Sequence, residues 1–157
     1  MSGRLQAEIK QQKPFPSIEA EAYLNLIRTT EHLRQGLEVL LKPHGLSPSQ
    51  YNVLRILAGS PEGLACTEIG NRMINRDPDI TRLLDRLETR NLVSRSRDSV
   101  DRRVIVTRIT DEGRELLGQL DQPLLDLQHQ QIGHMGESTL RQLIEVLELA
   151  RSGSEPT

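Results

Sequence analysis

Arginine and threonine side chains recur at helical spacing near the middle of the chain. Arg82 and Arg86 are one turn apart, and Thr81 lies beside them. An arginine fork makes paired hydrogen bonds to guanine or phosphate, and threonine can donate, accept or touch a thymine methyl. This spacing is suited to the major groove of double-stranded DNA. Amphipathic helices with mixed Arg and Asp are also common as plain solvated surfaces, so both interpretations stay open for the helix alone.

The helix that would carry these side chains has recognisable ends. Asp77 and Pro78 predict an N-cap and a first turn, because aspartate accepts a free backbone N–H and proline has none to leave unpaired. Asn91 predicts the left-handed residue that ends the helix. The stripe expected to face the core is Ile80, Leu83, Leu84 and Leu87. The opposite side, called the polar face below, carries Pro78, Thr81, Arg82, Asp85 and Arg86.

A charged hairpin is predicted directly after this helix. Aliphatic runs at 92–93 and 104–106 predict two antiparallel strands joined by a polar tip. The tip carries Arg97, Arg102 and Arg103, with Asp98 and Asp101 between them. Arginines on a loop beside such a helix are suited to a minor groove, whose negative potential attracts them. A solvated hairpin tip is the alternative for the loop alone.

The charge of the chain is unevenly distributed. The 157 residues have a formal net charge of −2, which by itself does not favour nucleic-acid binding. Residues 72–108 nevertheless hold 10 of the 20 basic residues, all of them arginine, and have a net charge of +4. Residues 1–71 are balanced, and residues 109–157 have a net charge of −6. Positive charge confined to the helix and hairpin is typical of a localised contact with duplex DNA.

Several motifs together resemble the MarR-type winged helix-turn-helix transcriptional regulators of bacteria. They are GLSPSQYNVLRIL at 45–57, EIGNRM at 68–73, ITRLLDRLETRNLV at 80–93, the Asp101-Arg102-Arg103 triplet, and Thr110-Asp111-Glu112-Gly113. The resemblance covers about residues 18–150, and the combination is specific although no single motif is. Asn91 stands where the family usually has Gly, and Ala65 where Ser or Thr often caps a helix.

The resemblance implies a homodimer that binds a pseudo-palindromic operator and acts as a repressor. In many members of the family a small molecule, often an anionic aromatic compound, releases the operator. In the family, the arginine two residues after the hairpin aspartate enters the minor groove, which here is Arg103, steered by Asp101. Asn75 and Arg76 are expected to hold phosphate with the helix N-terminus. The expected effector cleft is lined by Arg28, His32, Tyr51 and Arg55. Plain surface and core roles are the alternatives for these four residues.

The expected fold is mainly α (α+β), a winged helix-turn-helix with long N- and C-terminal dimerisation helices. We expect a disordered leader at 1–17, a single domain at 18–150 and a disordered tail at 151–157. Within the domain, 18–46 and 111–150 form the dimerisation helices and 47–110 the winged helix lobe. Dimerisation would hold two recognition helices about one DNA turn, roughly 34 Å, apart. A monomeric core that packs the terminal helices together is the alternative.

Other classes of protein fit less well. No apolar stretch approaches the roughly 18 residues of a membrane span, and the polar N-terminus is unlike a signal peptide, so no membrane partner and a cytoplasmic protein are expected. A phosphate-binding glycine loop and a nucleophile elbow are missing, which argues against an enzyme. The histidines lack zinc spacing, and no metal or cofactor is expected. Cys66 is an oxidation sensor or a small buried filler. A helical dimeric adaptor without DNA binding is the rival function.

Overall fold

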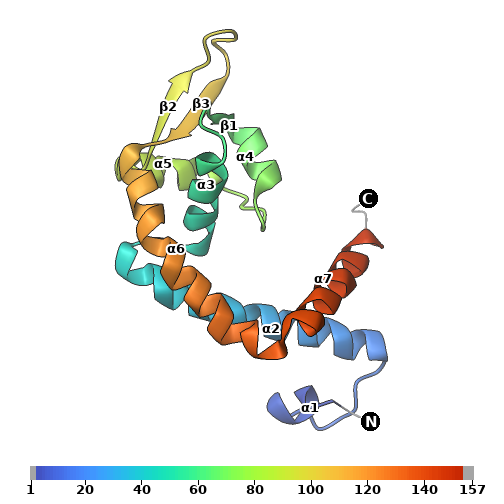
Figure 1. The fold of residues 1–157 in the computed structure, drawn as a ribbon. Coiled ribbons are helices and arrows are strands. Elements are labelled where there is room, and N and C mark those ends of the chain that lie inside the picture. Colours follow the sequence, from blue (N-terminus) through green and yellow to red (C-terminus); the bar gives the residue numbers. More distant parts are fainter. Residues whose placement is uncertain (1–2, 154–157) are drawn as a thin grey trace.

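The computed structural model describes residues 3–153. Two long helices form an elongated base, and a compact lobe with a protruding hairpin stands at one end of them (Figure 1). The helices are α1 (Leu5–Glu8), α2 (Ile18–Leu41), α3 (Pro48–Ala58), α4 (Cys66–Arg72), α5 (Ile80–Thr89), α6 (Asp111–Ile132) and α7 (Glu137–Ser152). The strands are β1 (Leu64–Ala65), β2 (Val93–Arg97) and β3 (Ile105–Ile109), and η1 (Lys42–His44) and η2 (Gly133–Met135) are short 3-10 turns. This is the expected α+β winged helix.

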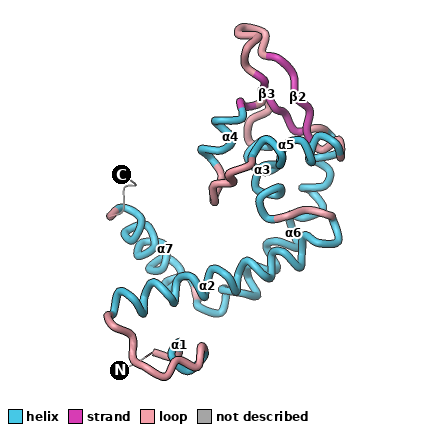
Figure 2. Tube along the Cα trace, turned by 180° about the vertical axis from the view of Figure 1, so that it is seen from behind, coloured by secondary structure: helices cyan, strands magenta, loops and turns pink. Residues whose placement is uncertain are grey.

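The base is made by α2 and α6, which lie against each other and run in opposite directions (Figures 1 and 2). The side-chain amide of Gln131 on α6 donates to the carbonyl of Leu33 on α2, with 3.2 Å between nitrogen and oxygen. The helix α2 passes into η1 and ends there, because Gly45 follows with a φ of 65° and lets the chain turn toward α3. The helix α7 follows η2 and projects away from α6.

The N-terminal segment differs from the expected disordered leader. Residues 5–8 form the turn α1, and Leu5 is only 3% exposed. The backbone N–H of Gly3 donates to the Glu21 carboxylate on α2 at 2.8 Å. The buried Leu5 and the hydrogen bond to Glu21 order this segment. Neither is evident from its average composition, which is polar. Of the expected tail, residues 151–152 complete α7, and residues 154–157 lie outside the described part of the chain.

The core of the lobe lies between α3, α4, α5 and the sheet. The helix α3 begins with a capping box, in which Ser47 and Gln50 exchange hydrogen bonds of 3.1 and 2.9 Å. Its inward side chains meet the apolar stripes of α4 and α5. The fully buried members of this core include Leu54, Leu57, Ile69, Leu84, Leu87 and Val93. The amphipathic patterns of these three helices therefore converge on one core.

The sheet has the antiparallel order β1-β3-β2. The predicted hairpin is confirmed, with Val93 opposite Ile109 and Arg97 opposite Ile105. The strand β1 was not predicted, because two residues are too few to show alternation. It pairs Leu64 with Thr107, directly after Gly63, whose φ of 86° favours glycine.

Candidate DNA-binding surface

The start of α5 corrects the predicted cap. Asp79, not Asp77, is the N-cap, and its side chain accepts a hydrogen bond from the backbone N–H of Arg82 at 3.3 Å. Asp77 instead accepts from the backbone N–H of Asp79 at 2.9 Å. Pro78 therefore lies in the turn before the helix, where it is exposed. Asp-Pro-Asp offers two carboxylates for capping, and Ile80 is the first apolar residue after them that packs against the core.

The two faces of α5 are separated as predicted. Leu83, Leu84 and Leu87 are 8%, 1% and 0% exposed. Thr81, Arg82, Asp85 and Arg86 are all exposed on the other side. The guanidinium of Arg82 lies 3.2 Å from the carboxylate of Asp79, so the cap residue also restrains this arginine. The polar face is thus open to a ligand along the length of the helix.

Two residues that the sequence did not single out hold the ends of α5. Before the helix, the side-chain oxygen of Asn52 on α3 accepts from the backbone N–H of Ile74 at 2.9 Å. This contact anchors the segment that carries the exposed Asn75 and Arg76. After the helix, Arg90 donates to the carbonyls of Gly45 and His44 at 2.8 and 2.9 Å. Their partners are distant in sequence, so no local pattern predicts either contact.

The hairpin presents its arginines in defined orientations. Arg103 is 91% exposed and makes a two-pronged contact with Asp101, with both nitrogen–oxygen distances at 3.1 Å. These hydrogen bonds lower the pKa of Asp101 and raise the pKa of Arg103. Arg97 donates to the carbonyl of Arg102 across the tip at 2.8 Å. The aspartate beside Arg103 therefore orients the arginine, as the resemblance implied.

The helix α5 and the hairpin occupy the same lobe, with the hairpin tip pointing away from α2 and α7 (Figures 1 and 2). A hydrogen-bonded contact between Arg95 on β2 and two acids on α5 joins them. Asn91 connects the two elements with a φ of 58°, which confirms the predicted left-handed residue. The arginines of α5 and of the hairpin therefore lie on adjoining elements of the structure. In the sequence they fall within about forty residues of one another.

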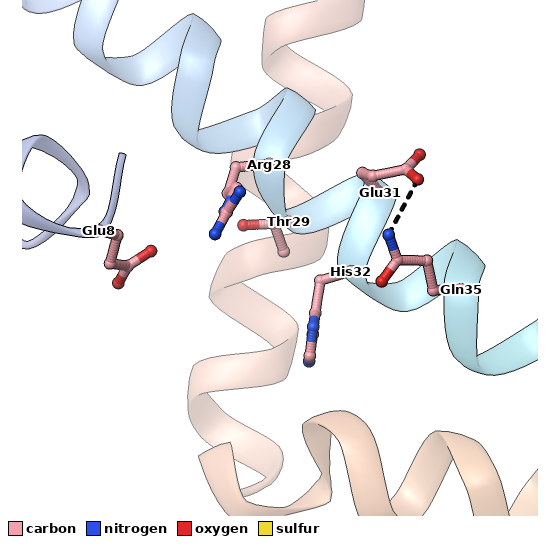
Figure 3. A pocket seen from close by; sticks show the side chains of 6 residues that line it. All are labelled: Glu8, Arg28, Thr29, Glu31, His32 and Gln35. Atoms are coloured by element: carbon pink, nitrogen blue, oxygen red, sulfur yellow. Dashed lines mark hydrogen bonds between the residues drawn. The ribbon is translucent and has the colours of Figure 1, made fainter. Parts of the chain in front are cut away.

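The residues expected to line an effector cleft lie in two places. Arg28 and His32 line a polar pocket of about 400 Å³ on α2, with Glu8 of α1 across from them (Figure 3). Tyr51 is buried on α3, its hydroxyl accepts from Arg55 at 2.7 Å, and Arg55 also contacts Asp121. Tyr51 and Arg55 are not among the residues that line the pocket of Arg28 and His32.

A different, largely apolar cavity of about 640 Å³ lies between α2, α6 and the start of α3. Leu33 and Leu37 line it from α2, and Leu124 and Leu127 line it from α6. Ile74 and Asn75 also line it, so the cavity reaches the segment that leads into α5. Arg34 stands at this cavity and is paired with Glu31 and Glu38.

Residues 3–153 contain no group of three His, Cys, Asp or Glu side chains placed as metal ligands would be. No helix in the same range combines the length and apolar character needed to cross a bilayer. Cys66 is the first residue of α4 and is partly buried, so its packing is that of a small apolar side chain.

Comparison with known proteins agrees with this geometry. Residues 46–105 match the model of the MarR family. The chain is 38% identical over 101 residues to the transcriptional repressor MdtR of Bacillus subtilis, covering 64% of each. Three curated relatives that are at least 31% identical to the chain are covered over 42% to 64% of their length. These relatives are transcriptional regulators and not enzymes.

Two solved structures extend the likeness to nearly the whole chain. A MarR transcription factor from Planctomyces limnophilus is 41% identical, with a TM-score of 0.66, over 87% of this chain and 99% of that one. The regulator Sco3205 of Streptomyces coelicolor is 23% identical and shares the fold, with a TM-score of 0.79 over 94% of both chains. The winged lobe, its flanking helices and these similarities together place the chain in the MarR family of transcriptional regulators.

Proposed function

We propose that this protein binds a specific, pseudo-palindromic DNA operator as a homodimer and acts as a repressor. The observation that carries the proposal is the joint display of the polar face of α5 and the hairpin arginines on one lobe. Thr81, Arg82 and Arg86 would enter the major groove, and Arg103 would enter the adjacent minor groove. Asn75, Arg76 and the exposed start of α5 would hold the phosphate backbone, with Arg97 and Arg102 adding charge.

One solved structure and one curated relative support this assignment. Sco3205, which has the same fold, was crystallised in complex with DNA. MdtR, at 38% identity, is a transcriptional repressor. The net charge of +4 over residues 72–108 is confined to the segment that forms α5 and the hairpin. Electrostatic attraction to the duplex is therefore strongest where the proposed contacts lie.

Dimerisation is supported by apolar side chains that a single chain leaves uncovered. On α2, Tyr23, Leu26 and Ile27 are 64%, 42% and 52% exposed. On α7, Val146 and Leu149 are 61% and 73% exposed. Burying these side chains against a second copy would remove apolar surface from water and pair two lobes by a two-fold axis. A two-fold protein matches a palindromic operator.

Regulation by a small aromatic effector is part of the proposal. The cavity between α2, α3 and α6 offers apolar walls for a ring, and Arg34 is the cation beside it. Because Ile74 and Asn75 also line the cavity, an occupant would contact the segment that precedes the phosphate-holding Arg76. Displacing this segment would weaken DNA binding. The experiment is a titration of protein–DNA complex with a panel of aromatic carboxylates, with Leu127→Trp as the variant in which the cavity is filled.

Selecting duplexes from a random library with the full chain tests the DNA-binding proposal. We expect enrichment of one inverted repeat, with half-sites about 10 base pairs apart, centre to centre. Enrichment of a single half-site would contradict the dimer. Recovery of unselected sequences at physiological salt would contradict specific binding. Retention of no duplex at all would favour the adaptor function instead.

A further inference from the structure

Arg95 is the hairpin residue that reaches back to α5. It lies on β2 opposite Thr107 of β3. Its Nη2 atom lies 2.5 Å from a carboxylate oxygen of Asp85 and 2.9 Å from one of Glu88. Its backbone N–H also donates to the second carboxylate oxygen of Glu88 at 3.1 Å. Side chain and backbone of one residue are therefore both bonded to the last two turns of α5.

This contact differs from an ordinary surface ion pair. The Arg95 side chain is 24% exposed, whereas that of Arg103 is 91% exposed. Isolated exposed pairs contribute little, but one guanidinium between two carboxylates, with a backbone anchor, has a well-defined geometry. The hydrogen bond from Arg95 lowers the pKa of Glu88, and that same bond is the leading cause of the raised pKa of Arg95. Glu88 and Arg95 therefore stay ionised together at neutral pH.

The other arginines of the hairpin are bonded differently. The side chain of Arg97 donates to Arg102, that of Arg103 to Asp101, and that of Arg108 to Ser96. Each of these bonds ends within the hairpin itself. A rotation of the hairpin relative to α5 would preserve them, whereas it would break the bonds of Arg95 to Asp85 and Glu88.

We propose that Arg95 is a positioning residue of the DNA-binding surface. It holds the hairpin at one angle to α5, so that Arg103 reaches the minor groove while Arg82 occupies the major groove. It also shields Asp85, which belongs to the polar face and would otherwise repel DNA phosphates. This inference rests on the proposed function, because it concerns the relative placement of the two proposed DNA contacts, Arg82 in the major groove and Arg103 in the minor groove.

A double-mutant cycle separates positioning from simple charge. Affinity for the selected operator is measured for the wild type, Arg95→Met, Arg103→Ala and the double variant. We expect Arg103→Ala to weaken binding about tenfold in the wild type. In the Arg95→Met background, Arg103→Ala should weaken binding less than about threefold. The reason is that a loosened hairpin no longer places residue 103 in the groove, so removing its side chain costs little.

Arg108→Met is the matched control. It removes one arginine from the neighbouring strand β3, whose contact is with Ser96 and not with α5. We expect the effect of Arg103→Ala to remain about tenfold in this background. Thermal melting and light scattering verify that each variant is folded and has the wild-type mass. If Arg95→Met does not fold, the pair Asp85→Ala and Glu88→Ala removes the same bonds from the helix side.

The outcomes distinguish this inference from the proposed function. Non-additive effects of Arg95→Met and Arg103→Ala, together with additive effects of Arg108→Met and Arg103→Ala, support the positioning role. Additive effects of Arg95→Met and Arg103→Ala on a wild type that binds its operator would overturn it and leave the proposed function intact. A wild type that binds no duplex overturns both.

Discussion

Two arginines of the candidate DNA-binding surface are restrained by a neighbouring carboxylate. Asp79 holds Arg82 from the N-cap of α5, and Asp101 holds Arg103 at the hairpin tip. Both pairs are largely exposed, so solvent screens them and they constrain the side chains without holding them strongly. Each arginine can therefore exchange its aspartate for a base or phosphate at small cost. A restrained arginine also loses less conformational freedom when it binds.

We expect Arg82→Ala to reduce operator affinity by about 1–3 kcal/mol and to relax the preference at one operator position, because a bidentate base contact is lost. Competition binding with single-base operator variants measures this. Arg141→Ala is the matched control. The side chain of Arg141 is 73% exposed and that of Arg82 is 69% exposed, and each is paired with a carboxylate one turn earlier in the chain. An unchanged base preference in Arg82→Ala would contradict base recognition by this residue.

We expect Arg103→Ala to weaken binding to operator and random duplex by similar factors and to flatten the salt dependence of affinity. One lost contact with the negative groove should lower the slope of log affinity against log salt by about one. Fluorescence anisotropy over a salt series gives the slope. Loss confined to the operator, with the wild-type slope, would show that Arg103 reads sequence instead.

The pKa of Glu88 reports the Arg95 contact in the absence of DNA. Because hydrogen bonding to Arg95 lowers this pKa from its ordinary value of 4.5, Glu88 should titrate at lower pH in the folded protein. Its contribution to stability is then present above pH 4.5 and is lost as the pH falls through the lowered value. In Arg95→Met the midpoint should move up toward 4.5. Carboxyl-carbon NMR measures this midpoint in the wild type and in Arg95→Met.

At the scale of elements, local signals predicted most helix ends but not all of them. Ser47 and Thr110 cap α3 and α6 as their neighbouring residues indicate. Two aspartates compete to cap α5, and the packing of Ile80 decides between them. The strand β1 owes its place to a turn and to pairing with β3. A two-residue strand such as β1 has almost no sequence pattern from which it could be predicted.

Gly63 is the residue on which β1 depends. A Cβ atom there would lie 2.5 Å from Val106 and 2.9 Å from the Thr107 carbonyl, at a φ of 86°. Gly63→Ala should therefore destabilise the fold by more than about 2 kcal/mol. Gly118 on α6 meets nothing within 4 Å, so Gly118→Ala should stabilise the fold by about 0.5–1 kcal/mol. Urea unfolding compares the two, and equal effects would contradict the steric argument.

At the scale of the whole molecule, the exposed apolar side chains of α2 and α7 require a partner surface or remain in water. The proposed dimer explains why two long helices flank a lobe that has its own core. The lobe alone buries its apolar stripe, whereas α7 contains no buried residue. The terminal helices therefore depend on association far more than the lobe does.

We expect light scattering to show a dimer at micromolar concentration and Leu149→Glu to shift it toward monomer. Leu149 is 73% exposed in the single chain, and burying an unpaired carboxylate against a second copy would be costly. Val100→Glu is the control, because Val100 is 92% exposed at the hairpin tip, far from α7. A wild-type monomer, or equal shifts in both variants, would contradict dimerisation through α7.

The sequence by itself determined the features that depend on near neighbours. Apolar periodicity, the capping box at Ser47, the left-handed Asn91 and the concentration of arginine between residues 72 and 108 all follow from residues close together in the chain. These were enough to predict the winged helix and both faces of α5. The same local features identified the candidate DNA-binding residues. The roles of those residues remain predictions.

Only the tertiary structure decided how distant segments meet. It selected Asp79 as the cap of α5, turned Arg95 toward Asp85 and Glu88, and separated Arg28 and His32 from Tyr51 and Arg55. The physical reason is that hydrogen bonds and packing between elements depend on where each backbone runs in space. Residue types along one segment encode its local conformation, but the partner of a side chain is chosen by the fold as a whole.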